Sequence, residues 1–430
     1  MRTVFLFLAL CFGSLLQAQT LLTPEDAVAL ALKNNFDIRL SANSLRQDSI
    51  DNSIGNAGML PTLNFVGSSG LASSQVSQQL SSGSDLSYNP LNNSNINLGV
   101  ELNWTIFDGG KMFIRKDILE KYQSLGETSL HAAIMQVSLE VLQTYYSLVM
   151  MNEQLRSIDT LISYNQNREI IAKAAFESGN TGKNSWIQAK IDLNIALASR
   201  LRQVQNIRES IAVLNTKMAV QSDFLYSVSD FIDVESNFNF EAARNQLAGK
   251  NLQLISKSQL KQIAALELKN VRRTYQPVIQ INAGYYLSAY TNSDGSVLSS
   301  RSLGPEMGVG LRMPIYQAGQ INREVEKAKL NVQNAEIDYE KSFLKALYEV
   351  ENCQIEFETA KAALELEQEN FELAKEYLTI SAARMQQGQA SLLEVHQAQV
   401  EYIESSARLV NLKMDAKLAE LKLRFILSEL

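Results

Sequence analysis

Proline is scarce in this chain, with only 6 among 430 residues. None lies in residues 111–276, and none follows Pro314. Glycine is scarce there too, because Gly388 is the one glycine after Gly319. Turns between short elements are rich in proline and glycine, so these stretches have few turns. The shortage excludes a mostly β enzyme, disfavours a doubly wound α/β fold and predicts long helices.

Cysteine and excess basic charge are also lacking. Cys11 and Cys353 are too few for a disulfide framework. Lys and Arg number 39 against 46 Asp and Glu, which gives a net charge of −7. We therefore expect no nucleic acid partner, since such partners require a basic surface. No run of 18 apolar residues follows the first twenty, so we expect no transmembrane helix.

The first 19 residues are typical of a secretory signal peptide. Arg2 supplies the positive charge, residues 4–16 form a short apolar core, and Ala18 lies in a small-residue cleavage region. A buried N-terminal helix is the alternative. Cleavage would remove Cys11 and leave Cys353 as the single cysteine.

The chain contains an internal repeat. Asn35 corresponds to Asn251 at a spacing of 216, and Gly179 corresponds to Gly388 at a spacing of 209. The seven-residue difference is expected in a loop, because loops tolerate insertion. We predict a first structural repeat over 20–220, a linker over 221–238 and a second repeat over 239–430.

Each repeat predicts a short helix followed by strands. The first helix begins after Thr23, whose capping side chain precedes a proline and two acids, and it should reach nearly to Pro61. Apolar and polar residues then alternate over 96–106, which indicates a strand. Loops rich in Ser, Asn and Gln are expected between the paired strands, at 72–95 and 288–302.

Long helices complete each repeat. Residues 111–178 are expected as one helix of about 100 Å, from 1.5 Å per residue. A turn at 179–182 in the first repeat, or at Gly388 in the second, is followed by a second helix that runs antiparallel to the first. Apolar and small residues recur at steps of four and three from Ile321 to Ala346, which is a coiled-coil pattern. The predicted fold class is mainly α, with long antiparallel coiled-coil hairpins and a small β part of four strands.

Four strands are too few for a closed transmembrane barrel, whose smallest forms have about eight. Strands of about nine to eleven residues can span an outer membrane, so several chains would have to share one barrel. Two chains give eight strands and three give twelve, and the residues alone do not choose. The competing hypothesis is a periplasmic coiled-coil structural or adaptor protein without a pore. The predicted strands argue against this hypothesis, because in such a protein their edges would be exposed.

Three kinds of segment occur in order along the chain. They are Leu22–Ala31, the strand-to-helix step Trp104–Gly110 with its counterpart Met313–Gly319, and Gly388–Ala398. Together, with matching spacings, they resemble the TolC family of outer-membrane efflux proteins over nearly all of the mature chain. The first step departs from the family pattern, because Trp104-Thr105 replaces the proline that the second step keeps.

The resemblance implies a homotrimer in the outer membrane of a Gram-negative bacterium, with a periplasmic extension. Twelve strands would form a barrel in outer-membrane lipid, and twelve helical segments would form a tunnel, the α-barrel. The chain would be the exit duct of a tripartite efflux or type I secretion system; it would not be an enzyme and would need no cofactor. Its partners would be a periplasmic adaptor and an inner-membrane transporter of the RND, ABC or MFS type.

The resemblance also implies a periplasmic gate. Acidic residues on the second return helix narrow the tunnel entrance in the family. The matching positions here are Glu394, which keeps the acid, and Gln397, which does not. Three copies of Glu394 around an axis would favour cations. The alternative is a solvated residue beside a turn.

The helix tips would dock the adaptor, through Gly179, Gly182, Gly388 and Ser391. Positive φ at the glycines would allow the tight turns, and turn geometry alone is the alternative role. The two histidines, His131 and His396, lie in different repeats, so we expect no metal site.

Overall fold

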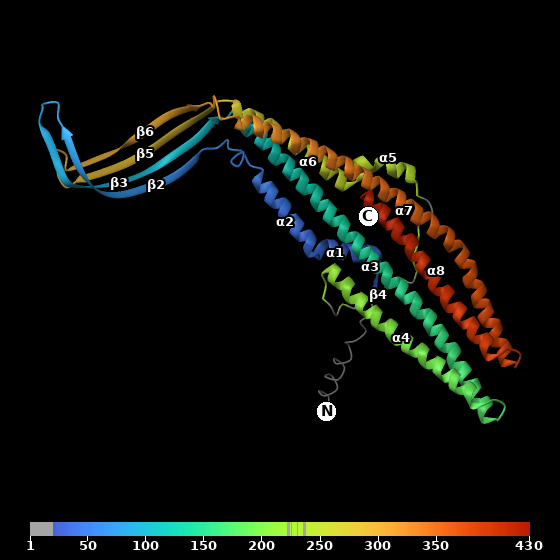
Figure 1. Cartoon of the computed structure of the whole chain (residues 1–430). Coiled ribbons are helices and arrows are strands. Elements are labelled where there is room, and N and C mark those ends of the chain that lie inside the picture. Colours follow the sequence, from blue (N-terminus) through green and yellow to red (C-terminus); the bar gives the residue numbers. More distant parts are fainter. Residues whose placement is uncertain (1–19, 222–223, 225, 230, 235–237) are drawn as a thin grey trace, which may run out of the picture. The chain divides into compact units, whose positions relative to one another are not determined.

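The computed structural model describes residues 20–221, 224, 226–229, 231–234 and 238–430, so the predicted signal peptide lies outside the described residues. The chain divides into two compact units (Figure 1). Unit 1 comprises Met1–Asn43, Thr128–Ile255 and Lys341–Leu430, and unit 2 comprises Ser44–Glu127 and Ser256–Glu340. Each unit therefore contains parts of both predicted repeats, whose boundaries stay a prediction.

Two antiparallel helix pairs make up most of unit 1 (Figure 1). The first pairs the later part of α3 (Lys111–Glu177) with α4 (Lys183–Met218), and the second pairs the later part of α7 (Gln320–Gln386) with α8 (Leu392–Ile426). The end of α3 lies one residue from the predicted end. Of the eight predicted coiled-coil positions on α7, Ile321, Ala328 and Ala346 are buried and the other five are partly buried.

Buried apolar side chains of α3, α4 and α8 form the core of unit 1, among them Val141, Leu214 and Met414. Tyr145 is fully buried within this core. Its hydroxyl donates to the carbonyl of Leu22 at 2.8 Å and accepts from the backbone N–H of Ser229 at 3.0 Å. These bonds hold the short strands β1 (Thr20–Leu22) and β4 (Tyr226–Val228), which pair in parallel.

The first predicted helix is broken at Asn35. It forms α1 (Pro24–Asn34), with the predicted capping box at Thr23, and α2 (Phe36–Asp51). The prediction of one helix to nearly Pro61 is wrong because the Asn35 side chain competes for the backbone. Its oxygen accepts from Asp37 N–H at 2.8 Å, and its amide donates to the carbonyl of Lys217 at 2.8 Å.

The same break recurs in the second half of the chain. Asn251 separates α5 (Phe240–Lys250) from α6 (Leu252–Arg272), and its amide donates to the carbonyl of Ile426 at 2.9 Å. Lys217 and Ile426 lie 209 residues apart, which is the repeat spacing predicted for this part of the chain. We call each of these two bonds, with its asparagine and its carbonyl, an asparagine clasp.

Unit 2 contains a four-stranded antiparallel sheet in the order β2-β3-β5-β6. Its strands are β2 (Thr62–Gln79), β3 (Asp85–Phe107), β5 (Val278–Asn292) and β6 (Ser299–Arg312). The loops predicted at 72–95 and 288–302 are therefore wrong in extent, because β2 and β3 stay paired as far as Gln79 and Asp85. Backbone hydrogen bonds form this ladder whatever the side chains, and strand preference depends strongly on context.

The strand-to-helix step after β3 follows from its residues. The Asp108 carboxylate accepts from Met112 N–H at 3.0 Å and so caps α3. Gly109 has a φ of +75°, and a Cβ there would lie 2.3 Å from the Cβ of Gln276. Glycine is therefore required at this position. After this step, Ile114 and Ile118 near the start of α3 pack against Ile263 of α6. The 3₁₀ turn Arg273–Tyr275 follows α6 directly.

Candidate functional site

The first tip, between α3 and α4, is built on Gly179. Its φ is +76°, and its N–H donates to the carbonyl of Phe176 at 3.0 Å, which is a glycine-terminated helix end. Gly182 is different: its φ of −70° and ψ of 151° suit any residue. The prediction that positive φ explains both glycines is wrong for Gly182, which instead lies at the N-cap of α4 without a side-chain cap.

The second tip, between α7 and α8, has the same turn with a better cap. Gly388 has a φ of +73°, and Gln389 N–H donates to the carbonyl of Arg384 at 2.8 Å. Ser391 caps α8, because its hydroxyl accepts from Glu394 N–H at 3.2 Å. Ser391 corresponds to Gly182 at the spacing of 209, so one tip is capped by a side chain and the other is not.

The predicted gate residue Glu394 is paired within its own chain. Arg384 donates to its carboxylate at 2.8 Å and to the carbonyl of Gln389 at 3.2 Å. The Glu394 side chain is 30% exposed and that of Arg384 is 48% exposed. Gln397 lies one turn further along α8 and is exposed. The structure therefore places a basic group directly beside the predicted acid, which the sequence pattern did not indicate.

The two tips also differ in their aromatic side chains. Phe176 and Trp186 stack with ring centroids 5.8 Å apart, and the indole N–H of Trp186 donates to Glu169 at 2.8 Å. The positions equivalent to this pair at the second tip are Met385 and Val395. A partner that contacts both tips would therefore meet two different surfaces.

A buried polar cluster lies between the helices of unit 1, close in sequence to the tips. Arg168 of α3 is only 4% exposed. Its guanidinium donates to Asp192 of α4 at 2.7 Å and to the side-chain oxygen of Gln399 of α8 at 3.3 Å. Gln399 in turn donates to Asn165 at 3.1 Å. The cluster joins the first helix pair to a helix of the second, and we call it the Arg168 cluster.

Sequence reasoning missed the Arg168 cluster. One feature of the sequence could have indicated it: Asn165 and Arg168 lie between the apolar positions Ile162 and Ala172 of α3. All four of these residues are buried. His396 lies at the edge of the cluster, with its Nδ1 atom 4.0 Å from the Asp192 carboxylate. Within the described ranges, no three His, Cys, Asp or Glu side chains gather as a metal site.

No helix in the described part of the chain has both the length and the hydropathy needed to cross a membrane. The family model for outer membrane efflux proteins matches residues 27–216 and 245–429. The chain belongs to this family. As an outer membrane efflux protein it is a transport protein of the Gram-negative outer membrane and not an enzyme, and the predicted family, location and class of function are confirmed.

Individual members of the family agree with this assignment. The solvent efflux pump outer membrane protein SrpC and the toluene efflux pump outer membrane protein TtgI, both from Pseudomonas putida, are each 24% identical over 407 residues, which is 91% of this chain and 82% of theirs. The crystal structure of the outer membrane protein VceC from Vibrio cholerae has a TM-score of 0.75 at 17% identity, covering 94% of this chain and 96% of that one. The Campylobacter jejuni CmeC channel has a TM-score of 0.75 at 18% identity, covering 94% and 85%.

These likenesses confirm the predicted fold class in its main features, namely long helices packed in pairs and a four-stranded antiparallel sheet. The match to the family model decides between the two functional hypotheses, since an efflux channel component fits the family and a poreless coiled-coil scaffold does not. The roles predicted for Glu394, Gln397 and the tip residues stay predictions.

Proposed function

We propose that three copies of this outer membrane efflux protein form one exit duct of a tripartite efflux or type I secretion system. The duct passes solutes to the exterior from a periplasmic adaptor and an inner-membrane transporter of the RND, ABC or MFS type. The observation that carries the proposal is the open sheet of unit 2. Among the described residues, β2 and β6 each pair with one neighbour only.

Open edges of this length require a partner strand. β2 has 18 residues and β6 has 14, and exposed edges as long as these promote pairing with other chains. Pairing of β6 from one copy with β2 of the next closes a ring without edges. Three copies supply twelve strands, the number that the family resemblance implies.

The helices of unit 1 offer a second surface for another copy. Large apolar residues on α7 are exposed at spacings of 4, 7, 11, 7 and 7 residues, which keeps them close to one face of the helix. They are Leu344, Tyr348, Ile355, Leu366, Leu373 and Ile380, with 48% to 68% of each exposed. α4 exposes a shorter set that includes Ile187, Ile191 and Ile195. Packing α7 of one copy on α4 of the next would remove both sets from water.

The trimer is tested by mass measurement of the full chain in lipid nanodiscs. Leu366→Lys places a charge in the α7 set and should shift the protein from three copies toward one. Gln368→Lys is the matched control, because Gln368 is exposed and lies nearly opposite on the helix. Equal effects of the two changes, or a wild-type monomer without conductance in planar bilayers, would reject the trimeric duct.

Glu394 and Gln397 are proposed as gate positions near the second tip. Because Arg384 pairs with Glu394, the field of a three-copy acid ring would be reduced. Arg384→Gln should therefore increase cation selectivity in planar bilayers, and Glu394→Gln should decrease it. Glu401→Gln, a change of an exposed acid farther along α8, is the control. Identical selectivity in all four proteins would remove Glu394 from the gate.

Adaptor docking is proposed at the two tips, through Gly179, Gly182, Gly388 and Ser391. The open space around the three glycines supports this, since an added Cβ there would have no neighbour within 4 Å. Small apolar solutes are one proposed cargo class, because the names of SrpC and TtgI refer to solvents and toluene. Loss of toluene tolerance on deletion, restored by the wild-type gene alone, would support that class.

A further inference from the structure

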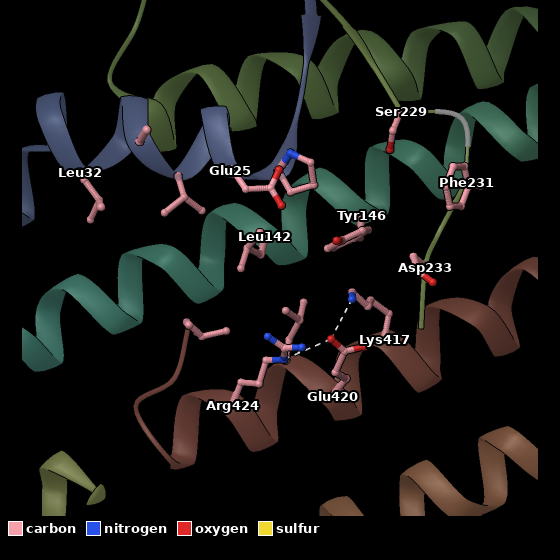
Figure 2. Close-up of a pocket in the computed structure, with 15 residues that line it drawn as sticks. Glu25, Leu32, Leu142, Tyr146, Ser229, Phe231, Asp233, Lys417, Glu420 and Arg424 are labelled. Carbon is pink, nitrogen blue, oxygen red and sulfur yellow. Dashed lines mark hydrogen bonds and ion pairs between the residues drawn. The ribbon is translucent and has the colours of Figure 1, made fainter. Parts of the chain in front are cut away.

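A cavity in unit 1 has features of a small-molecule site. Its volume is about 680 Å³, within the range of about 300–1,000 Å³ found for ligand pockets. The walls come from α1, α3, α8 and the segment after β4, with Leu430 completing them (Figure 2). Every lining residue belongs to unit 1.

One wall of the cavity is apolar. Leu142 of α3 and Leu421 of α8 belong to it, as do Val28, Ala29 and Leu32 of α1. Such a wall suits a hydrocarbon or aromatic group of a ligand, but it does not favour a ligand charge of either sign. The charged side chains of the cavity therefore decide which ligand fits.

The basic groups of the cavity are held by a buried acid. Glu420 is 2% exposed, and its Oε1 atom lies 2.8 Å from Lys417 Nζ and 3.3 Å from Arg424 Nε (Figure 2). Lys417 also lies over the ring of Tyr146, with its Nζ 5.0 Å from the centroid. Both basic side chains are thus paired with an acid of the same cavity, which reduces the positive charge that they offer to a ligand.

The two other acids of the cavity have no such partner. Glu25 and Asp233 are exposed and line the cavity, and neither forms an ion pair with any residue that the structure describes. Among the described residues that line it, the cavity thus has three side-chain carboxylates and two basic side chains. Burial is the main cause that raises the pKa of Tyr146 to about 12, and the charges of Glu420, Glu25 and Asp233 add to it.

We propose that this cavity binds an organic monocation with an apolar body, with its charge near Glu25 and Asp233 and its body against Leu142 and Leu421. The ring of Phe231, which also lines the cavity, adds a surface that cations favour. This site goes beyond the exit-duct proposal and does not depend on it, because binding requires neither transport nor a pump partner.

Tetraphenylphosphonium is the probe, and tetraphenylborate is its control of similar shape and opposite charge. Equilibrium dialysis of both ions is done on the full chain in zwitterionic nanodiscs, with empty nanodiscs subtracted. We expect saturable binding of the cation at one site per chain and binding of the anion at least about tenfold weaker. Equal binding of both ions, or no cation binding above empty nanodiscs, would overturn the proposal.

Five variants test the location of the site, and one of them is a control. Glu25→Gln and Asp233→Asn should each weaken cation binding by up to about fivefold, and together by about tenfold or more. Ala29→Phe fills the cavity from an exposed position and should abolish binding. Glu241→Gln changes an exposed acid of α5 outside the cavity and should leave binding unchanged. Wild-type thermal midpoints show that each variant is folded, and unchanged affinity in the double variant or in Ala29→Phe would refute the site.

Discussion

The Arg168 cluster allows a sharp test of what holds the helix pairs together. Changing Asp192 to Asn removes a charge 2.7 Å from a guanidinium that is 4% exposed. At that distance two unit charges attract by about 6 kcal/mol at an effective dielectric constant of about 20. Part of this attraction is retained in Asp192→Asn, because the Asn side-chain oxygen still accepts a hydrogen bond from Arg168. Removing one partner of a buried pair costs about 3–5 kcal/mol, and we expect a loss in this range.

The loss should be local, so the assay is native-state hydrogen exchange of the full chain in nanodiscs. Amides of α3, α4 and α8 near the cluster should exchange about a hundredfold to a few thousandfold faster in Asp192→Asn, since each 1.4 kcal/mol is tenfold. The apolar double variant Arg168→Met with Asp192→Leu should recover most of the protection, because well-packed apolar residues often replace a buried pair without loss.

The chain has a matched control for this experiment. Arg200 of α4 and Asp159 of α3 are also 2.7 Å apart, but their side chains are 43% and 46% exposed. Exposed pairs contribute at most about 1 kcal/mol, so Asp159→Asn should change exchange by less than about tenfold. Two results would contradict this reasoning: equal changes in exchange rate in the two Asn variants, or no recovery of protection in the double variant relative to Asp192→Asn. Either would mean that burial of the Arg168 cluster does not stabilise the packing of the helix pairs.

Four further predictions concern single residues. Burial raises the pKa of the Cys353 thiol to about 11, so maleimide labelling followed by peptide mass should be slow at pH 8 and speed up about tenfold per pH unit. Burial acts to raise the pKa of Glu367, but hydrogen bonds from Ser405 and Asn370 and the charge of Arg408 outweigh it and hold the pKa below the usual 4.5. Its stabilising effect is therefore complete above pH 4.5 and lost as pH falls through the lowered pKa, and Glu367→Gln should flatten the acid side of a plot of melting midpoint against pH. Gly388→Ala should destabilise the second tip by about 1–2 kcal/mol because of its positive φ, whereas Gly182→Ser should stabilise the first by roughly a few tenths, both measured by hydrogen exchange at the tips.

Features encoded by local sequence were predictable. Gly179 and Gly388 have nearly the same positive φ, as expected for equivalent turns in a repeat. The bounds of α3 follow from the absence of proline between Asp108 and the first tip, a stretch in which Gly126 is the one glycine inside the helix. The capping box at Thr23 depends on residues three apart, which a single sequence contains in full.

Features that depend on distant pairing were not predictable. Arg168 and Gln399 are 231 residues apart, and a helical pattern does not indicate which distant side chain fills a gap in a packed face. The extra length of β2 and β3 arises from backbone pairing between Ser- and Asn-rich segments, whose side chains give little sign of it. The break at Asn35 depends on the carbonyl of Lys217, which lies at the other end of the first repeat.

The asparagine clasps have a consequence for how a partner could recognise the assembly. Each clasp ties an early residue to a late one, Asn35 to Lys217 and Asn251 to Ile426, so each half of the chain is closed on itself. A trimer would therefore contain six nearly equivalent asparagine clasps. Its tips would alternate between an aromatic stack at Phe176 and an ion pair at Arg384. A partner that binds beside the clasps would find six similar positions, and one that binds a single kind of tip would find three.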